Sequence, residues 1–117
     1  MKKIEAIIRK TKFEVVKEAL HEEGIDFFSY WDVRGHGTAR QERVYRGVMY
    51  DLSVIERIKL SFVVRDKFLD SAVNAILNSA KTGEVGDGKI FVSNIENSYR
   101  IRTGESGDQT LYVDGQE

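Results

Sequence analysis

The chain has 117 residues, a formal net charge of −1 and no cysteine. It is long enough for one domain with a hydrophobic core, and disulfides and thiolate metal sites are excluded. The near-neutral charge argues against a nucleic-acid binder, and His21 and His36 lie too far apart in the sequence to predict a metal site. No apolar run approaches the ~20 residues of a membrane span, and the N-terminus lacks the apolar core of a signal peptide, so we expect a cytoplasmic protein.

The first part of the chain predicts a strand, a helix and a second strand. Residues 2–9 alternate in hydropathy, as a strand with one buried face does. Three apolar side chains share that face: Ile4, Ala6 and Ile8. Thr11 and Glu14 have the spacing of a capping box, and Gly24 is placed to end the helix that follows. The aromatic-rich residues 25–34 predict the second strand.

A second strand-helix-strand unit follows. Residues 57–64 alternate as a third strand, and Asp66 is placed to cap a helix. Apolar side chains at helical spacing predict its buried stripe: Phe68, Leu69, Ala72, Val73, Ile76, Leu77 and Ala80. Residues 89–95 predict a fourth strand. Between the two units, residues 35–56 show no clear period over most of their length, which is typical of a functional or disordered loop; a plain hairpin extension of the neighbouring strands is the alternative.

The order of these elements predicts an α+β fold of the ferredoxin-like βαββαβ type, with four antiparallel strands and both helices on one face. We expect a single domain over residues 1–105, with a long loop at residues 35–56 and a polar tail at residues 106–117. Apolar residues on the uncovered sheet face favour a closed cyclic oligomer. Clefts between its subunits are then natural ligand sites.

The stretch KTGEVGDGKIF at residues 81–91 combines glycines with a lysine, a pattern that lets backbone N–H groups approach phosphate. Gly83, Gly88 and Lys89 have the spacing of a P-loop, but Ile90 stands where a Mg²⁺-binding Ser or Thr is required. The element order, helix before loop and strand after it, is also reversed. We therefore predict a phosphate cradle that is not a P-loop, against the alternative of a glycine-rich turn without a ligand.

A second basic pattern lies at residues 99–103, YRIRT. It predicts a short strand with Arg100 and Arg102 on the same side, where two guanidinium groups can pair with phosphate oxygens. A solvated strand edge is the alternative.

These motifs together resemble the PII nitrogen-regulatory signalling proteins, the GlnB/GlnK group, over about residues 1–105. The resemblance rests on the opening MKKIEAIIR, on the loop sequence YRG at residues 45–47 with Tyr50, on TGEVGDGKIFV at residues 82–92 and on YRIRTGE at residues 99–105. It implies a homotrimer in which ATP and ADP compete for three clefts between subunits. It implies the following nucleotide-binding residues: Ile7, Ser29, Gly35, Gly37, Thr38, Val63, Gly86, Asp87, Gly88, Lys89, Arg100 and Arg102, the two arginines coming from the neighbouring chain.

Members of that family sense 2-oxoglutarate together with Mg-ATP, which implies an effector site at Gly37, Gln41 and Arg57. The sequence departs from the family pattern here. Ala39 occupies the position of the family's glutamine, Arg57 that of its lysine, and Ser61 that of an acid. We therefore do not count on 2-oxoglutarate or Mg²⁺ binding, although a bidentate pair between Arg57 and a carboxylate is chemically feasible.

The resemblance also implies a role. Nucleotide occupancy would reorder residues 35–56, and this loop would control a target protein, so the chain is expected to be a sensor rather than an enzyme. Arg46 matches the arginine that enters the pore of ammonium transporters, which favours such a transporter over other proteins of nitrogen metabolism and would bring the protein to a membrane only through that partner. Tyr50 aligns with a tyrosine that many bacterial relatives have uridylylated.

Two alternatives have less support. A nucleotide-hydrolysing or phosphotransferring enzyme on the same scaffold would need a general base, for which only His36 and Asp87 are near. A trimeric metal-tolerance protein of the same fold is disfavoured because the chain has no cysteine and few histidines.

Overall fold

The computed structural model describes residues 1–36, 42–45, 48–51 and 54–111. Its helices and strands, in chain order, are β1 (Lys2–Arg9), α1 (Phe13–Glu22), β2 (Ser29–His36), β3 (Glu42–Tyr45), β4 (Val48–Asp51), β5 (Val54–Val64), α2 (Leu69–Ala80) and β6 (Lys89–Asn94). Short 3₁₀ turns precede both α-helices, and a third covers Asp108–Leu111.

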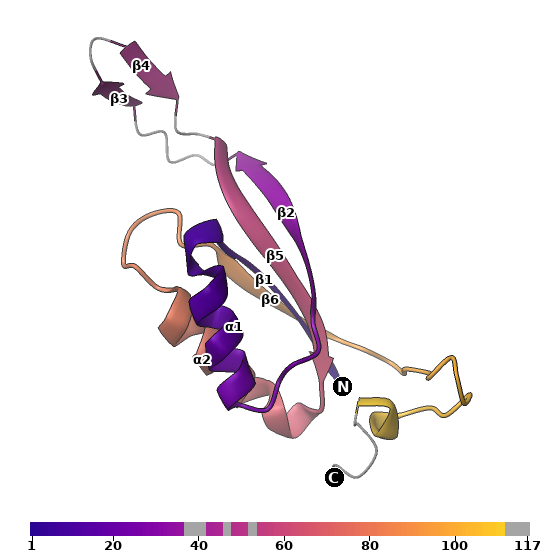
Figure 1. Ribbon diagram of the computed structural model, residues 1–117. Helices are drawn as coiled ribbons and strands as arrows, with labels where there is room; N and C mark the ends of the chain where they lie inside the picture. The colour runs from indigo at the N-terminus through magenta and orange to yellow at the C-terminus, as the bar shows by residue number, and fades with distance from the viewer. Residues whose placement is uncertain (37–41, 46–47, 52–53, 112–117) are drawn as a thin grey trace.

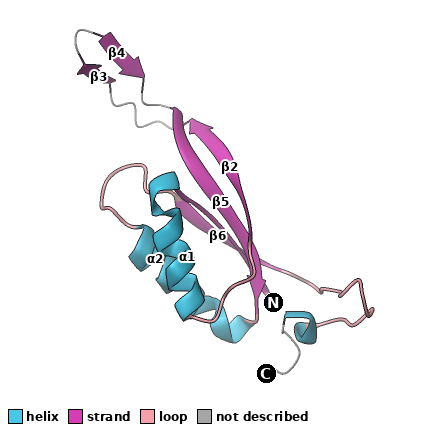
Figure 2. Ribbon diagram, in the orientation of Figure 1, coloured by secondary structure: helices cyan, strands magenta, loops and turns pink. Residues whose placement is uncertain are grey.

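The main sheet contains four strands in the order β2-β5-β1-β6, and every neighbouring pair is antiparallel. Both α-helices pack against one face of this sheet (Figures 1 and 2). With the chain order strand, helix, strand, strand, helix, strand in the main body, this is the ferredoxin-like arrangement, and the predicted fold class is confirmed.

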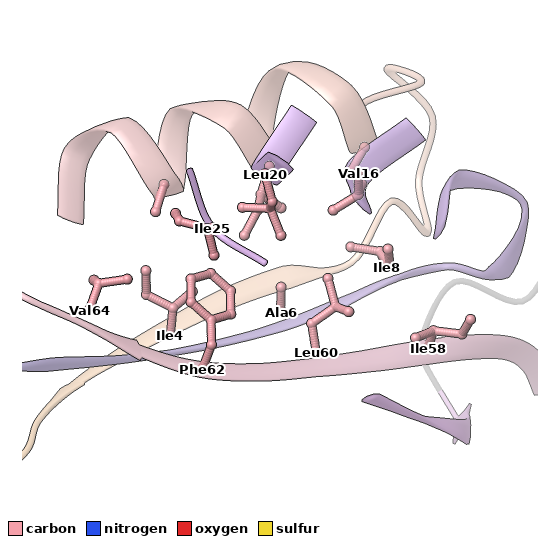
Figure 3. Packing of buried hydrophobic residues seen from close by; sticks show 13 residues of the cluster. Ile4, Ala6, Ile8, Val16, Leu20, Ile25, Ile58, Leu60, Phe62 and Val64 are labelled. Carbon is pink, nitrogen blue, oxygen red and sulfur yellow. The ribbon is translucent and has the colours of Figure 1, made fainter. Parts of the chain in front are cut away.

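The hydrophobic core lies between the helices and the sheet (Figure 3). The alternation predicted for residues 2–9 is confirmed, because Ile4, Ala6 and Ile8 are at most 1% exposed. Val16 and Leu20 of α1 meet this row from the helical layer. Fully burying one such aliphatic side chain stabilises the fold by about 1.5–3 kcal/mol, so the period-2 pattern of β1 and the helical stripe together determine which face of the sheet is covered.

Both helices begin differently from the sequence prediction. No side chain caps α1 or α2, because a 3₁₀ turn precedes each helix and already occupies the position of the expected cap. The capping box of Thr11 and Glu14 is therefore wrong. Asp66 instead accepts a hydrogen bond from the Met1 ammonium group at 2.8 Å. The predicted end of α1 is confirmed, since the Gly24 amide donates to the carbonyl of His21.

One residue of the predicted α2 stripe lies outside the core. Leu77 is 52% exposed, whereas Ala72 and Ile76 are buried. The predicted buried stripe is too wide. Leu77 follows Ile76 in sequence and is therefore rotated about 100° from it around the helix axis.

The segment between β2 and β5 contains more regular structure than we predicted. The ladder of β2 and β5 continues to the pair of His36 with Val54, and β3 and β4 form a separate two-stranded sheet. In Figure 1 this hairpin lies beyond the ends of β2 and β5. The extension of the neighbouring strands is confirmed at residues 35–36 and 54–56, and residues 42–45 and 48–51 form a hairpin of their own. For these described residues the prediction of an irregular segment is wrong. The short strands β3 and β4 were not predicted, because charged residues and glycines interrupt the apolar alternation by which a strand is recognised in a sequence.

Residues 99–103 do not form a strand. Tyr99 makes a single bridge to Ser106, and the amides of Thr103 and Gly104 both donate to the carbonyl of Arg100, which closes a turn.

The sheet face away from the helices is lined by alternating residues such as Ile7, and Trp31 and Phe91 there are 43% and 53% exposed. In the part of the chain that the structure describes, neither helix is long and apolar enough to cross a membrane.

Candidate functional site

The glycine turn (residues 81–88) joins α2 to β6 at one end of the sheet (Figure 1). It presses closely on β1 at Gly88, which has φ +101°. A Cβ atom built on Gly88 would lie 1.7 Å from the carbonyl oxygen of Ile7, far inside any real contact. Both the left-handed backbone and this contact require glycine at position 88. The turn is therefore fixed against the sheet through backbone atoms alone at this point.

Asp87 holds the two ends of the glycine turn together. Its carboxylate accepts hydrogen bonds from the amides of Thr82 and Gly83, both at 2.9 Å, and from the Thr82 hydroxyl. The Arg9 guanidinium adds a hydrogen bond at 3.0 Å. The Thr82 hydroxyl first, with its amide and then Arg9, holds the pKa of Asp87 far below its ordinary value. The Asp87 carboxylate is therefore ionised and hydrogen-bonded within the turn. Its lowered pKa makes it a poor general base.

Two arginines of the sheet donate hydrogen bonds to backbone carbonyls in the middle of the glycine turn. Arg9 lies at the end of β1 and donates to the carbonyl of Val85 at 3.0 Å. Arg57 is its cross-strand partner on β5 and donates to the carbonyl of Gly86. Gly35 of β2 lies beside Arg57, because a Cβ built there would come within 3.8 Å of the Arg57 Nε atom. The predicted residues Gly35, Arg57 and Gly86 therefore adjoin one another at this end of the sheet.

The register places the other predicted strand residues on the sheet face that the helices leave uncovered. Ile7 is opposite Lys89, Ser29 is opposite Ser61, and Val63 is opposite Lys3. These all belong to the face opposite the buried row of β1. Lys89, the first residue of β6, is exposed directly after the glycine turn, so its ammonium group is available to an anion there.

The arginine segment (residues 98–111) is folded on itself. Arg100 donates to a Glu105 carboxylate oxygen and to the carbonyl of Gln109, both at 3.2 Å, and the Ser98 hydroxyl is bonded to that of Thr110. The Thr103 hydroxyl, followed by Arg100, lowers the pKa of Glu105. Arg102 is exposed in the turn. Because residues 101–103 form a turn and not a strand, the predicted same-side arrangement of the two arginines does not hold.

The glycine turn and the arginine segment lie at opposite ends of the sheet. The six residues of β6 separate them, a span of about 17 Å at the rise of a β-strand, and Figure 1 shows the two segments beyond opposite ends of this strand. Lys89 and the predicted phosphate-binding arginines of one chain therefore do not converge on one small anion.

Several predicted residues lie outside the description. Gly37, Thr38, Gln41 and Arg46 belong to the residues that the structure does not describe. The backbone of Tyr50 is paired with Arg43 in the β3–β4 hairpin. Their predicted roles in nucleotide, effector and target binding, and the modification of Tyr50, stay predictions.

Sequence reasoning missed the contributions of Arg9 and Thr82. Arg9 follows Ile7 by two residues and so shares its face of β1, which is the signal that could have identified it. Thr82 precedes Asp87 by five residues at the start of a glycine-rich turn, and that spacing alone is weak. Within the described ranges, no group of three His, Cys, Asp or Glu side chains is arranged to hold a metal ion.

Comparison with known proteins gives one consistent result. The family model described as nitrogen regulatory protein P-II matches residues 1–105. A nitrogen regulatory protein P-II of Rhodobacter capsulatus is 45% identical over 112 residues, covering 95% of this chain and 100% of the relative. Its counterpart from Bradyrhizobium diazoefficiens is 46% identical over 108 residues, covering 92% of this chain and 96% of the relative. One from Haemophilus influenzae is 41% identical over 112 residues, covering 95% and 100%.

Proposed function

Because the chain belongs to the nitrogen regulatory protein P-II family and is therefore a regulatory protein and not an enzyme, we propose that it senses adenine nucleotides. ATP and ADP would compete for clefts between the subunits of a homotrimer. The occupancy of the clefts would change how the segment between β2 and β5 engages a target. The single observation that supports this most strongly is the separation of the glycine turn and the arginine segment, the two candidate phosphate-binding segments, by the length of β6.

That separation favours a site made by two chains. The glycine turn of one subunit supplies backbone N–H groups and Lys89, and the arginine segment of a neighbour supplies Arg100 and Arg102. The exposed Trp31 and Phe91 on the uncovered sheet face give the subunits apolar surface to bury, and a closed cyclic assembly covers such a face on every copy. Three positive side chains then meet a polyphosphate, each able to form charge-assisted hydrogen bonds.

A protein target fits a regulatory protein whose longest strands project beyond the helices. The β2–β5 ladder continues to His36 and Val54, and the β3–β4 hairpin lies beyond it. We propose an ammonium transporter as the target, on the identity of Arg46, and a cytoplasmic location with membrane contact only through that partner. The nucleotide would have to bind two arrangements of this segment with different affinity for the switch to work.

Sensing of 2-oxoglutarate has less support. The Arg57 guanidinium, at the position of the lysine that the family pattern requires, donates to the carbonyl of Gly86. A carboxylate ligand would have to compete with this bond. We therefore propose that 2-oxoglutarate and Mg²⁺ bind weakly or not at all.

Calorimetric titration of the full chain with ATP, ADP and AMP, with and without Mg²⁺ and 2-oxoglutarate, tests the proposal. We expect ATP and ADP to bind without turnover, to a protein that sedimentation shows to be a trimer. A monomer, or a trimer that binds neither nucleotide, would contradict the proposed sensor. Rapid phosphate release would favour the enzyme alternative. If the protein bound 2-oxoglutarate as tightly as family members do, Arg57 would have to give up its hydrogen bond to Gly86 and pair with the effector.

A further inference from the structure

We propose that Arg9 and Arg57 are positioning residues for the phosphate site: they hold the carbonyl groups of Val85 and Gly86 against the sheet, and so turn the following N–H groups outward to the ligand. This inference rests on the proposed nucleotide binding and deepens it. In it, neither arginine touches the phosphate. Each acts through a peptide plane of the glycine turn.

The geometry of the peptide group carries the argument. The C=O of one residue and the N–H of the next lie in one plane and point in opposite directions across a trans peptide bond, and none of the peptide bonds described is cis. Arg9 donates a hydrogen bond to the carbonyl oxygen of Val85 at 3.0 Å, so the N–H of Gly86 points away from Arg9. Arg57 donates to the carbonyl oxygen of Gly86, so the N–H of Asp87 points away from Arg57.

The two N–H groups have no hydrogen-bond acceptor among the residues that the structure describes. Among the described residues, no hydrogen bond from the amides of Gly86 or Asp87 is found. The nearby amides of Thr82 and Gly83, in contrast, are taken by the Asp87 carboxylate. Successive unpaired N–H groups in a glycine-rich turn form a concave anion site. The chain thus satisfies the amides at the start of the turn and leaves those at its centre for a ligand.

The placement of the arginines has a cost that supports a specific purpose. Arg9 and Arg57 are direct cross-strand partners, and like charges in that relation are destabilising. The carbonyls of Val85 and Gly86 and the Asp87 carboxylate accept their donors and offset this repulsion. Here the two arginines fix two consecutive peptide planes, which is what an oriented pair of N–H groups requires.

The test uses Arg57→Met, which keeps an unbranched apolar stem but removes the guanidinium donors, and Arg57→Lys, which restores a positive donor group on a flexible stem. We expect the methionine variant to bind ATP and ADP about tenfold more weakly, the scale of a hydrogen bond to a charged group, and to bind adenosine unchanged. The lysine variant should recover most of the loss. Arg65→Met is the matched control, because Arg65 lies just after β5 with its guanidinium over the Phe68 ring, away from the glycine turn.

A spectroscopic readout separates positioning from direct contact. In the nucleotide-free protein, the amide resonances of Gly86 and Asp87 should shift in Arg57→Met and return towards their wild-type positions in Arg57→Lys, while the Arg65→Met spectrum stays unchanged in this region. Weaker nucleotide binding with unshifted amides would mean that Arg57 contacts the phosphate itself, and wild-type binding by Arg57→Met would mean that the peptide planes do not depend on it. Either result overturns the inference.

The failure of this inference differs from the failure of the proposed function. If the wild-type protein binds no nucleotide, the sensor proposal fails, whereas the amide spectra still report whether Arg57 orients the turn. If the wild-type protein binds ATP and ADP but Arg57→Met does so equally well, only the positioning role fails.

Discussion

The glycine turn and the arginine segment are both rich in hydrogen bonds and both proposed to bind the same phosphate, yet they are held in opposite ways. The glycine turn is bonded to the sheet: Arg9 and Arg57 reach it from two strands, and Gly88 lies against the backbone of β1. Arg100 of the arginine segment donates within the segment itself, to Glu105 and to the carbonyl of Gln109.

This difference indicates what each half of the site requires. The glycine turn is ordered by its own chain before any ligand arrives, so it loses little conformational entropy on binding. The arginine segment is bonded within itself, and in the proposed trimer it would take its position relative to the phosphate from a neighbouring subunit. The two halves therefore respond to different perturbations: one to changes in the sheet, the other to changes in assembly.

The largest expected effect comes from Gly88→Ala. The φ of +101° costs a non-glycine residue about 1–3 kcal/mol, and the contact with the Ile7 carbonyl forces the turn off the sheet in addition. Chemical denaturation should show a large loss in the free energy of unfolding, together with loss of nucleotide binding. Gly83→Ala is the control, because Gly83 has φ +88° but nothing within 4 Å of an added Cβ. Equal losses in both variants would mean that the contact with β1 is not what fixes the turn.

The next effect separates the two segments by subunit. Lys89→Ala and Arg102→Ala should each weaken nucleotide binding by about 1.5–3 kcal/mol, the scale of a hydrogen bond to a charged group, with little change in the free energy of unfolding because both residues are exposed. Lys17→Ala, at an exposed lysine of α1 outside both segments, should leave the affinity unchanged.

Mixing the two weak variants sharpens this test. A cleft between an Arg102→Ala subunit and a Lys89→Ala subunit can contain both intact residues, so about a quarter of the clefts in randomly mixed trimers should recover wild-type affinity. Competition calorimetry or nucleotide fluorescence on the refolded mixture would measure that fraction. If no clefts recover, the two residues serve the same cleft from one chain or do not share a cleft.

The smallest effect is the order in which the two segments respond to acid. The pKa of Asp87 and that of Glu105 are both lowered in the folded chain. Each carboxylate therefore stabilises its segment above its unfolded pKa and loses that contribution as the pH falls through its folded pKa. The shift is larger at Asp87, and its ordinary pKa is also the lower one, so Glu105 should protonate first. Carbon-detected NMR titration of both carboxyl groups measures the order, and protonation of Asp87 before Glu105 would contradict it.

The sheet and the covering helices could be predicted because their signal is burial. Ile4, Ala6 and Ile8 alternate along β1, whose predicted bounds are the observed ones, and the stripe of α2 repeats at helical spacing. The second strand was predicted to start at residue 25, whereas β2 begins at Ser29. The helix starts could not be predicted from Thr11 and Asp66, because a cap depends on a local backbone conformation that a preceding 3₁₀ turn removes. A polar residue before a helix indicates the boundary without determining the bond it makes.

The glycine turn was predicted in part, and the ligand of the candidate site stays a prediction. The glycines and Lys89 carry their own pattern, and the turn formed where that pattern indicated. Arg9 was missed, and Arg57 was assigned to an effector, because their bonds to Val85 and Gly86 depend on strand register and on a contact between segments 29 residues apart or more. The turn at Arg102 was missed because two arginines separated by one residue look the same in a strand and in a closed turn.

The paired end of β2 and β5 has a practical consequence for engineering. His36 and Val54 are directly opposed in an antiparallel ladder, so their Cα atoms lie about 5 Å apart. The chain therefore leaves the sheet at the end of β2 and re-enters it at the adjacent start of β5. We therefore expect that residues 37–53 can be exchanged as a cassette between related proteins while the strands that carry the core are kept. Chimeras cut at this pair would report which properties belong to the cassette and which to the scaffold.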